Sequence, residues 1–232
     1  DTFNITSDSV ANRFDGQGGT DTLRYNTTTT PLTFNFNGSG GLSQVLSTNP
    51  ADSFTNFETL MSGSGDDIFN VNDDTGLVSI NSNIGDDTIN VDTLNNDVTI
   101  NGSTGTDTVN YDAVATDLTL NLAATRTITN GIQTHTLLSI EEYVTGTGDD
   151  IINLVGNANT TIDGHTGNDT FNVTWSGNHI LNAGAAADTD TIDYTSAAAL
   201  TLTYTGTGTD TVSVGATTDT LINFDSFNLG AG

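Results

Sequence analysis

Two neighbouring stretches of the chain decide the fold, because they repeat one pattern at a fixed spacing. The first reads Ile80-Asn81-Ser82-Asn83-Ile84-Gly85-Asp86-Asp87-Thr88-Ile89-Asn90-Val91. The second, twenty residues later, reads Ile100-Asn101-Gly102-Ser103-Thr104-Gly105-Thr106-Asp107-Thr108-Val109-Asn110-Tyr111. In both, a turn rich in glycine and aspartate is followed by apolar residues that alternate with polar ones. A period of two places the apolar side chains on one face of a β-strand.

The same turn recurs along most of the chain. Gly-x-Gly-Asp-Asp stands complete at residues 63–67 and 146–150, and close variants occur elsewhere. The turns end at Asp21, Asp67, Asp87, Asp107, Asp150, Asp169, Asp190 and Asp210. From Asp67 onward the steps are 20, 20, 43, 19, 21 and 20 residues. Such a period is typical of stacked repeats, so we expect an all-β protein: one continuous parallel β-solenoid over residues 1–232, of about 11 coils of about 20 residues.

A longer repeat divides the chain into internal units 1–65, 66–148 and 149–232. Residues 31–36 match residues 117–122 and 199–204, and residues 56–60 match residues 139–143 and 223–227. Between these two blocks we expect one further coil, whose acidic turn is lost at residues 38–41 and around Arg126 but kept at residues 206–210. Joined tail to head, residues 228–232 and 1–5 nearly rebuild the turn, which predicts head-to-tail continuation of the solenoid, either covalent or by stacking.

Composition excludes several classes of function. The chain has 29 acidic residues against three basic ones and a net charge of −26, so we expect it to bind neither nucleic acid nor an anionic membrane. The hydrophobic share of 34% is low enough for disorder, but the apolar residues are periodic and β-branched, which favours strands. No apolar run has transmembrane length, so we expect no membrane insertion. The sequence does not begin with methionine, which indicates a mature product or part of a longer protein.

Catalysis is also disfavoured by the residues present. The chain has no cysteine, no lysine, no Gly-x-Ser-x-Gly elbow and no His-Glu-x-x-His motif, and its three histidines are scattered. We expect the protein not to be an enzyme.

The chemistry of the repeated turn suits a hard cation. Glycines allow the tight backbone that leaves carbonyl oxygens exposed, and the aspartate adds an anionic oxygen. Calcium takes six to eight oxygen ligands, mixing carboxylates with backbone carbonyls. One turn supplies about half of these, and the same turn one coil away, at ~4.8 Å, supplies the rest.

This turn resembles the hemolysin-type, or RTX, calcium-binding nonapeptide Gly-Gly-x-Gly-x-Asp-x-apolar-x, which folds as a parallel β-roll. Residues 16–23 and 164–171 are the closest matches. The resemblance implies Ca²⁺ ligands at the eight turn-ending aspartates and at the acids preceding three of them, Asp66, Asp86 and Asp149. The chain departs from the family in carrying the motif once per coil, which implies one row of ions along one edge. The turn before Asp190 also lacks the second glycine.

Glycine–aspartate turns also form without metal. Because eight turns recur on a chain of net charge −26, and stacked carboxylates repel one another without cations, we favour calcium and expect calcium-dependent folding.

The leading functional hypothesis is a calcium-stabilised structural β-solenoid of a secreted or cell-surface protein, forming a filament, surface layer or adhesin stalk. It implies head-to-tail self-association, a surface or matrix partner, and an extracellular or cell-surface location, where RTX-like chains meet calcium. The alternative is a calcium-dependent ice-binding RTX solenoid, because the turns carry Thr104, Thr147, Thr166 and Thr207 in a regular position. An RTX domain that only aids the secretion and folding of an enzyme stays open.

Asparagines form two further columns. Asn4, Asn70, Asn90, Asn110, Asn153 and Asn172 follow the apolar residue of the motif and form either a hydrogen-bonded amide ladder or a row of solvated side chains. Asn81, Asn101, Asp163 and Asn182 stand where the turn begins, which predicts that they cap it.

Overall fold

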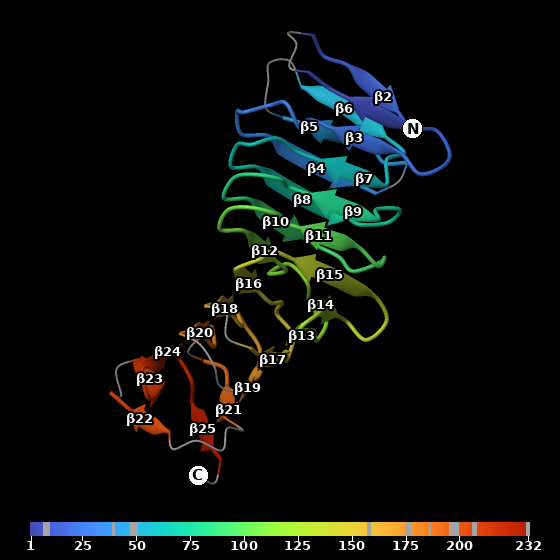
Figure 1. Cartoon of the computed structure of the whole chain (residues 1–232). Coiled ribbons are helices and arrows are strands. Elements are labelled where there is room, and N and C mark those ends of the chain that lie inside the picture. Colours follow the sequence, from blue (N-terminus) through green and yellow to red (C-terminus); the bar gives the residue numbers. More distant parts are fainter. Residues whose placement is uncertain are drawn as a thin grey trace. The chain divides into compact units, whose positions relative to one another are not determined.

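The computed structural model describes residues 1–6, 10–38, 40–46, 51–156, 159–174, 178–185, 187–194, 200–205 and 208–230. Of the residues that belong to the motifs and matching blocks described above, Ser39, Ala186, Ala199, Gly206, Thr207, Ala231 and Gly232 lie outside these ranges. Within them every regular element is a β-strand (Figure 1), and strands follow one another about every 9–10 residues in two mostly parallel sheets. The predicted all-β class and parallel β-solenoid fold are therefore confirmed.

The chain divides into two compact units. Unit 1 comprises Asp1–Tyr111 and Ile132–Ile140, and unit 2 comprises Asp112–Gly131 and Glu141–Gly232. The strands of unit 1 are β1 (Thr2–Asn4), β2 (Arg13–Asp15), β3 (Thr22–Arg24), β4 (Thr33–Asn37), β5 (Ser43–Val45), β6 (Asp52–Thr55), β7 (Thr59–Met61), β8 (Ile68–Asp73), β9 (Ser79–Asn81), β10 (Thr88–Val91), β11 (Thr99–Asn101), β12 (Thr108–Asn110) and β15 (Thr134–Leu138). The strands of unit 2 are β13 (Thr119–Leu122), β14 (Arg126–Thr129), β16 (Glu142–Val144), β17 (Ile151–Val155), β18 (Thr161–Asp163), β19 (Thr170–Thr174), β20 (Ile180–Asn182), β21 (Thr191–Tyr194), β22 (Thr201–Thr203), β23 (Thr209–Val214), β24 (Thr217–Ile222) and β25 (Ser226–Leu229).

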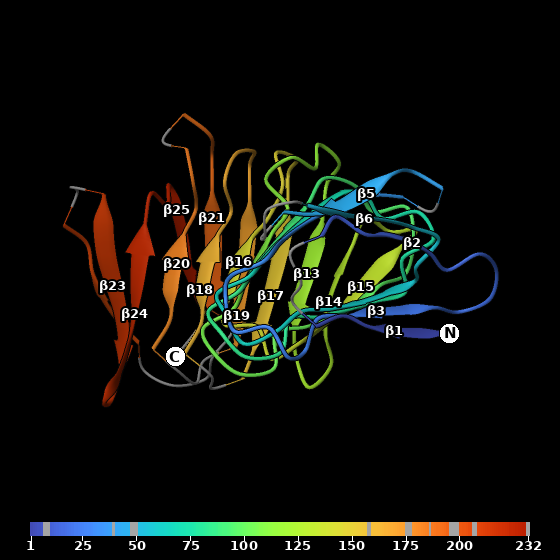
Figure 2. The same cartoon turned by 90° about the horizontal axis from the view of Figure 1, so that it is seen from above.

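Each unit consists of two sheets built from successive coils. In unit 1 one sheet has the order β1-β3-β7-β9-β11-β15 with parallel pairs throughout. The other has the order β2-β6-β5-β4-β8-β10-β12. In unit 2 the orders are β14-β13-β17-β19-β21-β25 and β16-β18-β20-β24-β23-β22. Figure 2 shows β18, β20, β24 and β23 of unit 2 in this succession.

The core follows from the two-residue alternation. In unit 1, one inward column is formed by side chains that pair in register from coil to coil, namely Leu23, Leu60, Ile80, Ile100 and Leu137. All five are buried. Burial of one such side chain contributes about 1.5–3 kcal/mol, so each added coil is stabilised by the coil before it. Aromatic residues stack in the same way, with the rings of Phe34 and Phe69 parallel and 4.5 Å apart.

A three-stranded antiparallel meander, formed by β4, β5 and β6, replaces the expected extra coil in the first internal unit. Strand β4 pairs antiparallel with β5, and β5 pairs antiparallel with β6, so the chain folds back within one sheet. Equivalent antiparallel pairs join β13 to β14, and β23 to both β22 and β24. The prediction that each of these three segments forms one further coil is therefore wrong. Strands in a meander alternate apolar and polar residues as coil strands do, so the pattern alone does not distinguish them.

Candidate functional site

The turn-ending aspartates point inward and are buried. Their exposed fractions run from 0% to 5% for Asp21, Asp67, Asp87, Asp107, Asp150, Asp169, Asp190 and Asp210. All except Asp210 directly precede a parallel strand. Asp210 lies instead within β23, opposite Leu221 of an antiparallel pair, and its Oδ1 accepts the N–H of Thr205 at 2.7 Å.

Seven of these buried aspartates, together with the half-buried Glu58 and the exposed Asp225, form three ladders. In each, a carboxylate accepts a hydrogen bond from the backbone N–H of the corresponding acid one coil earlier. In the second ladder (Asp67, Asp87, Asp107), Asp67 N–H donates to Asp87 at 2.7 Å and Asp87 N–H to Asp107 at 3.0 Å. In the third ladder (Asp150, Asp169, Asp190, Asp225), the three distances are 2.9, 2.7 and 3.1 Å. Each rung therefore ties two coils together at the start of their strands.

The first ladder consists of Asp21 and Glu58. It is formed by one hydrogen bond of this kind, which Asp21 N–H donates to Glu58 Oε2 at 2.7 Å. Glu58 and Asp225 were not among the predicted site residues. Both stand in the matching blocks 56–60 and 223–227, at the same block position, where the chain returns from a meander. That shared position was the available signal.

The ladders of unit 1 lie on both edges of the coil stack. The turn before Asp21 leads from β2 to β3, whereas the turns before Asp67, Asp87 and Asp107 lead in the other direction between the two sheets, from β7, β9 and β11 to β8, β10 and β12. The expectation of a single row along one edge is therefore wrong. The physical reason is the meander, because three strands in one sheet displace the next motif turn to the opposite edge.

An exposed outer row runs beside the buried ladders. Asp86 N–H donates to Asp66 Oδ1 at 3.0 Å, and Thr106 N–H donates to Asp86 Oδ1 at 2.8 Å. In unit 2, Asn168 N–H donates to Asp149 Oδ1 at 2.8 Å. These side chains reach toward the following coil, whereas the buried carboxylates reach toward the preceding one. The paired acids of Gly-x-Gly-Asp-Asp thus connect each turn to both of its neighbours.

The backbone of the turn explains its composition. Asn81 and Asn101 accept the N–H two residues later, at 3.0 and 3.2 Å, as predicted for caps; Asp163 and Asn182 do the same. The residue that donates has a positive φ, 75° at Asn83 and 69° at Ser103. At Gly105, φ is 146° and an added Cβ would lie 1.8 Å from the carbonyl oxygen of Gly85. Only glycine fits there.

The second carboxylate oxygen, Oδ2, differs among the ladder aspartates in its hydrogen bonding. Oδ2 of Asp21, Asp87, Asp169 and Asp190 is buried and has no hydrogen-bond partner among the described residues. In Asp67 and Asp150, Oδ2 accepts the N–H of Gly63 and of Gly146. Burial, together with the charges of the neighbouring ladder carboxylates, raises the pKa of Asp87 to about 7 and that of Asp169 to about 8. Burial also raises the pKa of Asp67, Asp150 and Asp190.

These oxygens fit a hard cation in part. Asp87, Asp169 and Asp190 each commit Oδ1 to a backbone N–H and leave Oδ2 as an oxygen donor. No group of three or more His, Asp or Glu side chains suited to a metal occurs among the described residues. Calcium held here would therefore take one oxygen from a ladder aspartate such as Asp87 or Asp169 and the remaining ligands from turn carbonyls or water, a mixture that calcium accepts.

The first asparagine column is a hydrogen-bonded ladder. Asn70 donates its amide to Asn35 at 2.8 Å and Asn90 to Asn70 at 2.9 Å, and Asn110 donates to Asn90 at 3.4 Å. In unit 2, Asn153 and Asn172 continue the pattern at 2.8 and 2.9 Å. Asn4 instead pairs in register with Arg24. Of the two interpretations, the amide ladder is confirmed for these five positions.

Each meander also buries a tyrosine against a polar partner. Tyr25 donates to Asp52 at 2.7 Å and Tyr194 donates to Asp219 at 2.9 Å. In the middle repeat the Tyr111 hydroxyl contacts His135 Nδ1 at 2.8 Å. His135 Nε2 in turn lies 3.1 Å from Asp74. No local sequence pattern predicts these contacts, because the partners are at least 24 residues apart.

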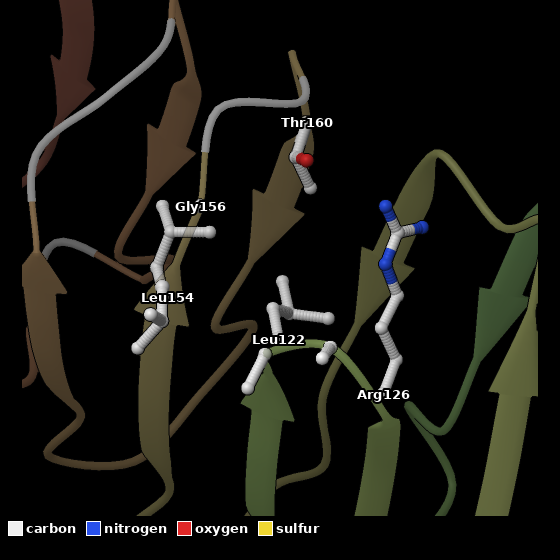
Figure 3. A pocket seen from close by; sticks show the side chains of 8 residues that line it. Leu122, Arg126, Leu154, Gly156 and Thr160 are labelled. Atoms are coloured by element: carbon white, nitrogen blue, oxygen red, sulfur yellow. The ribbon is translucent and has the colours of Figure 1, made fainter.

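A separate pocket of about 340 Å³ lies in unit 2 (Figure 3). Its lining includes the apolar side chains of Leu122 and Leu154 together with Arg126, Gly156 and Thr160. Arg126 also donates to the Tyr143 hydroxyl at 3.1 Å. The pocket contains none of the ladder acids.

No protein-family model matches the chain, and no curated protein matches it. In the part of the chain that the structure describes, no helix is long and apolar enough to cross a membrane.

Proposed function

We propose that the chain is a calcium-stabilised structural β-solenoid of an RTX-like, secreted or cell-surface protein, serving as a filament, surface layer or adhesin stalk. The observation that carries this proposal is the burial, without a hydrogen-bond partner among the described residues, of Oδ2 of the ladder aspartates Asp21, Asp87, Asp169 and Asp190. A buried charge without a partner is costly, and a divalent cation at each coil would offset that cost. The ladders span the stacking direction, so the same ions would couple neighbouring coils.

The role proposed is mechanical rather than catalytic. Side-chain polar groups in the ladders and in the asparagine columns are used to join one coil to the next. Calcium is abundant outside cells, and extracellular calcium modules have dissociation constants near 10⁻⁴–10⁻³ M. An extracellular or cell-surface location, a surface or matrix partner and head-to-tail self-association are parts of this proposal.

The decisive test is thermal unfolding in calcium, in magnesium and in chelator, for the wild type and for Asp87→Asn. The amide of the variant still offers an oxygen to the Asp67 N–H but no longer supplies an anionic Oδ2. We expect calcium to raise the melting temperature of the wild type and to raise that of the variant less. Asp92→Asn is the matched control, because Asp92 is exposed and stands outside the ladders.

The opposite result has a clear meaning. If Asp87→Asn is more stable than the wild type in chelator and calcium changes both proteins equally, the ladder is a metal-free brace. The calcium proposal would then be withdrawn.

Calcium-dependent ice binding is a second candidate, favoured by an outward row of hydroxyls on unit 1. The row pairs in register from strand to strand and consists of Thr2, Thr22, Thr59, Ser79, Thr99 and Thr136. Strand spacing places its members ~4.8 Å apart. The row lies on a sheet face, not at the turn threonines on which the alternative first rested.

Thermal hysteresis in calcium measures this activity. Thr99→Lys would abolish it by interrupting the row, and Thr27→Lys, at an exposed loop position, would leave it intact. Absence of hysteresis in the folded wild type rules out ice binding and leaves the structural proposal standing.

A further inference from the structure

The pocket in unit 2 is lined by the single arginine of that unit. The three basic residues of the chain are Arg13, Arg24 and Arg126, and lysine is absent. Arg13 and Arg24 belong to unit 1, so Arg126 is the one permanently positive side chain of unit 2, and it lines the pocket. In an otherwise acidic unit, the pocket is therefore where an anion is attracted most directly.

Arg126 faces the interior of the coil. It pairs with Leu122 across β13 and β14, two residues along from the pair Leu120–Ile128. Side chains two residues apart on a strand share a face, and Leu120, Leu122 and Ile128 are all buried. From this position Arg126 reaches β16 in the other sheet of the unit, where it donates to the buried Tyr143 hydroxyl at 3.1 Å.

The Tyr143 hydroxyl supplies Arg126 with a hydrogen bond but no charge. Burial raises the pKa of Tyr143 to about 12, although the positive charge of Arg126 acts in the opposite direction. The hydroxyl therefore stays neutral at physiological pH and accepts from one of the five N–H groups of the guanidinium. The planar fork of a guanidinium matches a carboxylate, which accepts two parallel hydrogen bonds from it.

Much of the remaining lining is apolar. Of the eight residues that line the pocket, five are alanine, valine or leucine. In Figure 3 the guanidinium of Arg126 and Thr160 lie in the upper part of the view. The side chains of Leu122 and Leu154 lie below them. At Gly156 an added Cβ would meet nothing within 4 Å, so the pocket is open on that side. Its volume of about 340 Å³ is near the lower end of the range for small-molecule sites, which favours a small ligand.

An aromatic side chain occupies the corresponding place in the first repeat. Phe36 stands in the first matching block where Leu122 stands in the second. Each pairs with the strand of the following coil, Phe36 with Val71 and Leu122 with Leu154. Phe36 is buried and packs against Phe54, with ring centroids 6.4 Å apart. The middle repeat thus has a smaller side chain, beside the pocket, where the first repeat has a packed ring.

We propose that this pocket binds a small organic carboxylate that carries a short branched aliphatic tail. The carboxylate oxygens accept hydrogen bonds from the Arg126 guanidinium, and the tail lies against Leu122 and Leu154. An inorganic anion would use the arginine alone and leave the apolar lining against water, whereas a neutral aliphatic molecule would gain nothing from the charge. This site goes beyond the proposed structural role and does not depend on calcium, since no ladder acid lines the pocket.

Isovalerate is the probe for the test, and isoamyl alcohol is its uncharged counterpart with the same tail. The protein is isotopically labelled at its leucine methyl groups. Methyl NMR spectra are recorded in calcium near pH 7, where a carboxylate is ionised, and in about 0.15 M NaCl to screen the net charge of the chain. We expect isovalerate to shift the Leu122 and Leu154 methyl signals saturably and the alcohol to bind about 10–100-fold more weakly.

Three variants locate the binding, each checked for folding by circular dichroism. Arg126→Gln removes the charge and should weaken isovalerate binding about 10–100-fold while leaving the weak binding of the alcohol unchanged. Leu122→Phe introduces the residue type of Phe36 and should abolish binding of both molecules by filling the pocket. Arg13→Gln is the matched control, because Arg13 is exposed and belongs to unit 1, and it should bind as the wild type does.

Saturable shifts that are lost in Arg126→Gln and kept in Arg13→Gln support the inference. Absence of saturable shifts in the wild type overturns it, and so does equal isovalerate binding by the wild type and Arg126→Gln. Binding of the alcohol as tight as that of isovalerate also overturns it. If Leu122→Phe does not fold, the comparison of the two arginine variants still decides. Calcium stabilisation is measured separately by thermal unfolding, so failure of either proposal leaves the other standing.

Discussion

At the scale of the residue, contact between the backbones of neighbouring coils explains why one position of the turn is a glycine. The glycine two residues before the ladder aspartate approaches the preceding turn so closely that a side chain cannot fit. Gly85 and Gly105 both have φ in the region that side chains rarely adopt. The position two residues earlier in sequence than Gly85, Asn83, also has a positive φ but keeps a side chain. Steric contact, not the turn alone, therefore selects glycine.

Gly105→Ala should destabilise the protein strongly. The new Cβ would stand 1.8 Å from the Gly85 carbonyl oxygen at a φ of 146°, so both overpacking and backbone strain oppose it, at a cost of about 1–3 kcal/mol or more. The control is Gly18→Ala, because a Cβ there meets nothing within 4 Å. Urea unfolding monitored by circular dichroism measures both. Equal midpoints for the two variants would show that the turns do not pack as described.

At the scale of the element, the meanders are where the sequence was least informative. Alternation at Ile89 and Val91 correctly predicted inward-facing strand residues, and the caps at Asn81 and Asn101 were predicted from their place before the turn. Those signals are local. Whether a strand turns back antiparallel depends on partners far away in sequence, as β5 lies between β4 and β6, and a two-residue period is the same in both cases.

The same limit applies to the ladders. The sequence predicted acidic residues at regular spacing, but it did not predict that they are buried, and it placed them on one edge instead of two. The change of edge between Asp21 and Asp67 is caused by the intervening meander. Likewise His135 meets Asp74 across 61 residues, and neither residue belongs to the turn motif.

The meander pair Tyr194–Asp219 gives unit 2 a defined pH dependence. Burial raises the pKa of Asp219 from its ordinary value of 3.8 to about 6. The folded protein therefore holds a proton here that the unfolded chain has released, and this site's contribution to stability declines as the pH rises from about 4 to above 6. The full change is roughly 2–3 kcal/mol.

Asp219→Asn removes that dependence, because the amide does not titrate. We expect the stability of the variant relative to the wild type to improve between about pH 4 and pH 7.5 in chelator, by roughly the amount above. Urea unfolding at both pH values measures the difference, and Asp92→Asn is again the exposed control. A pH-independent difference between Asp219→Asn and the wild type would mean that Asp219 is ionised throughout.

At the scale of the whole molecule, repulsion among the acidic side chains lowers the stability of the folded state. The net charge of −26 is spread over exposed positions such as Asp66 and Asp86 and over the buried ladders. Mobile salt screens exposed charges, with a Debye length of about 10 Å at 0.1 M, but acts less on buried ones. The two classes of acid therefore respond differently to monovalent and divalent cations.

In chelator, raising NaCl from about 0.02 M to about 0.5 M should increase the melting temperature by screening the exposed acids. Calcium near 5 mM, above the ~10⁻³ M limit for extracellular modules, should add a further increase even at the higher salt, because NaCl does not reach the unpartnered Oδ2 atoms of Asp87 and Asp169. Magnesium at the same concentration controls for divalent charge and should stabilise less, since it accepts mixed carbonyl cages poorly. Calorimetry across these conditions separates the contributions. Full stabilisation by NaCl alone, with no further effect of calcium, would reduce the role of cations to screening and leave the ladders as hydrogen-bonded braces.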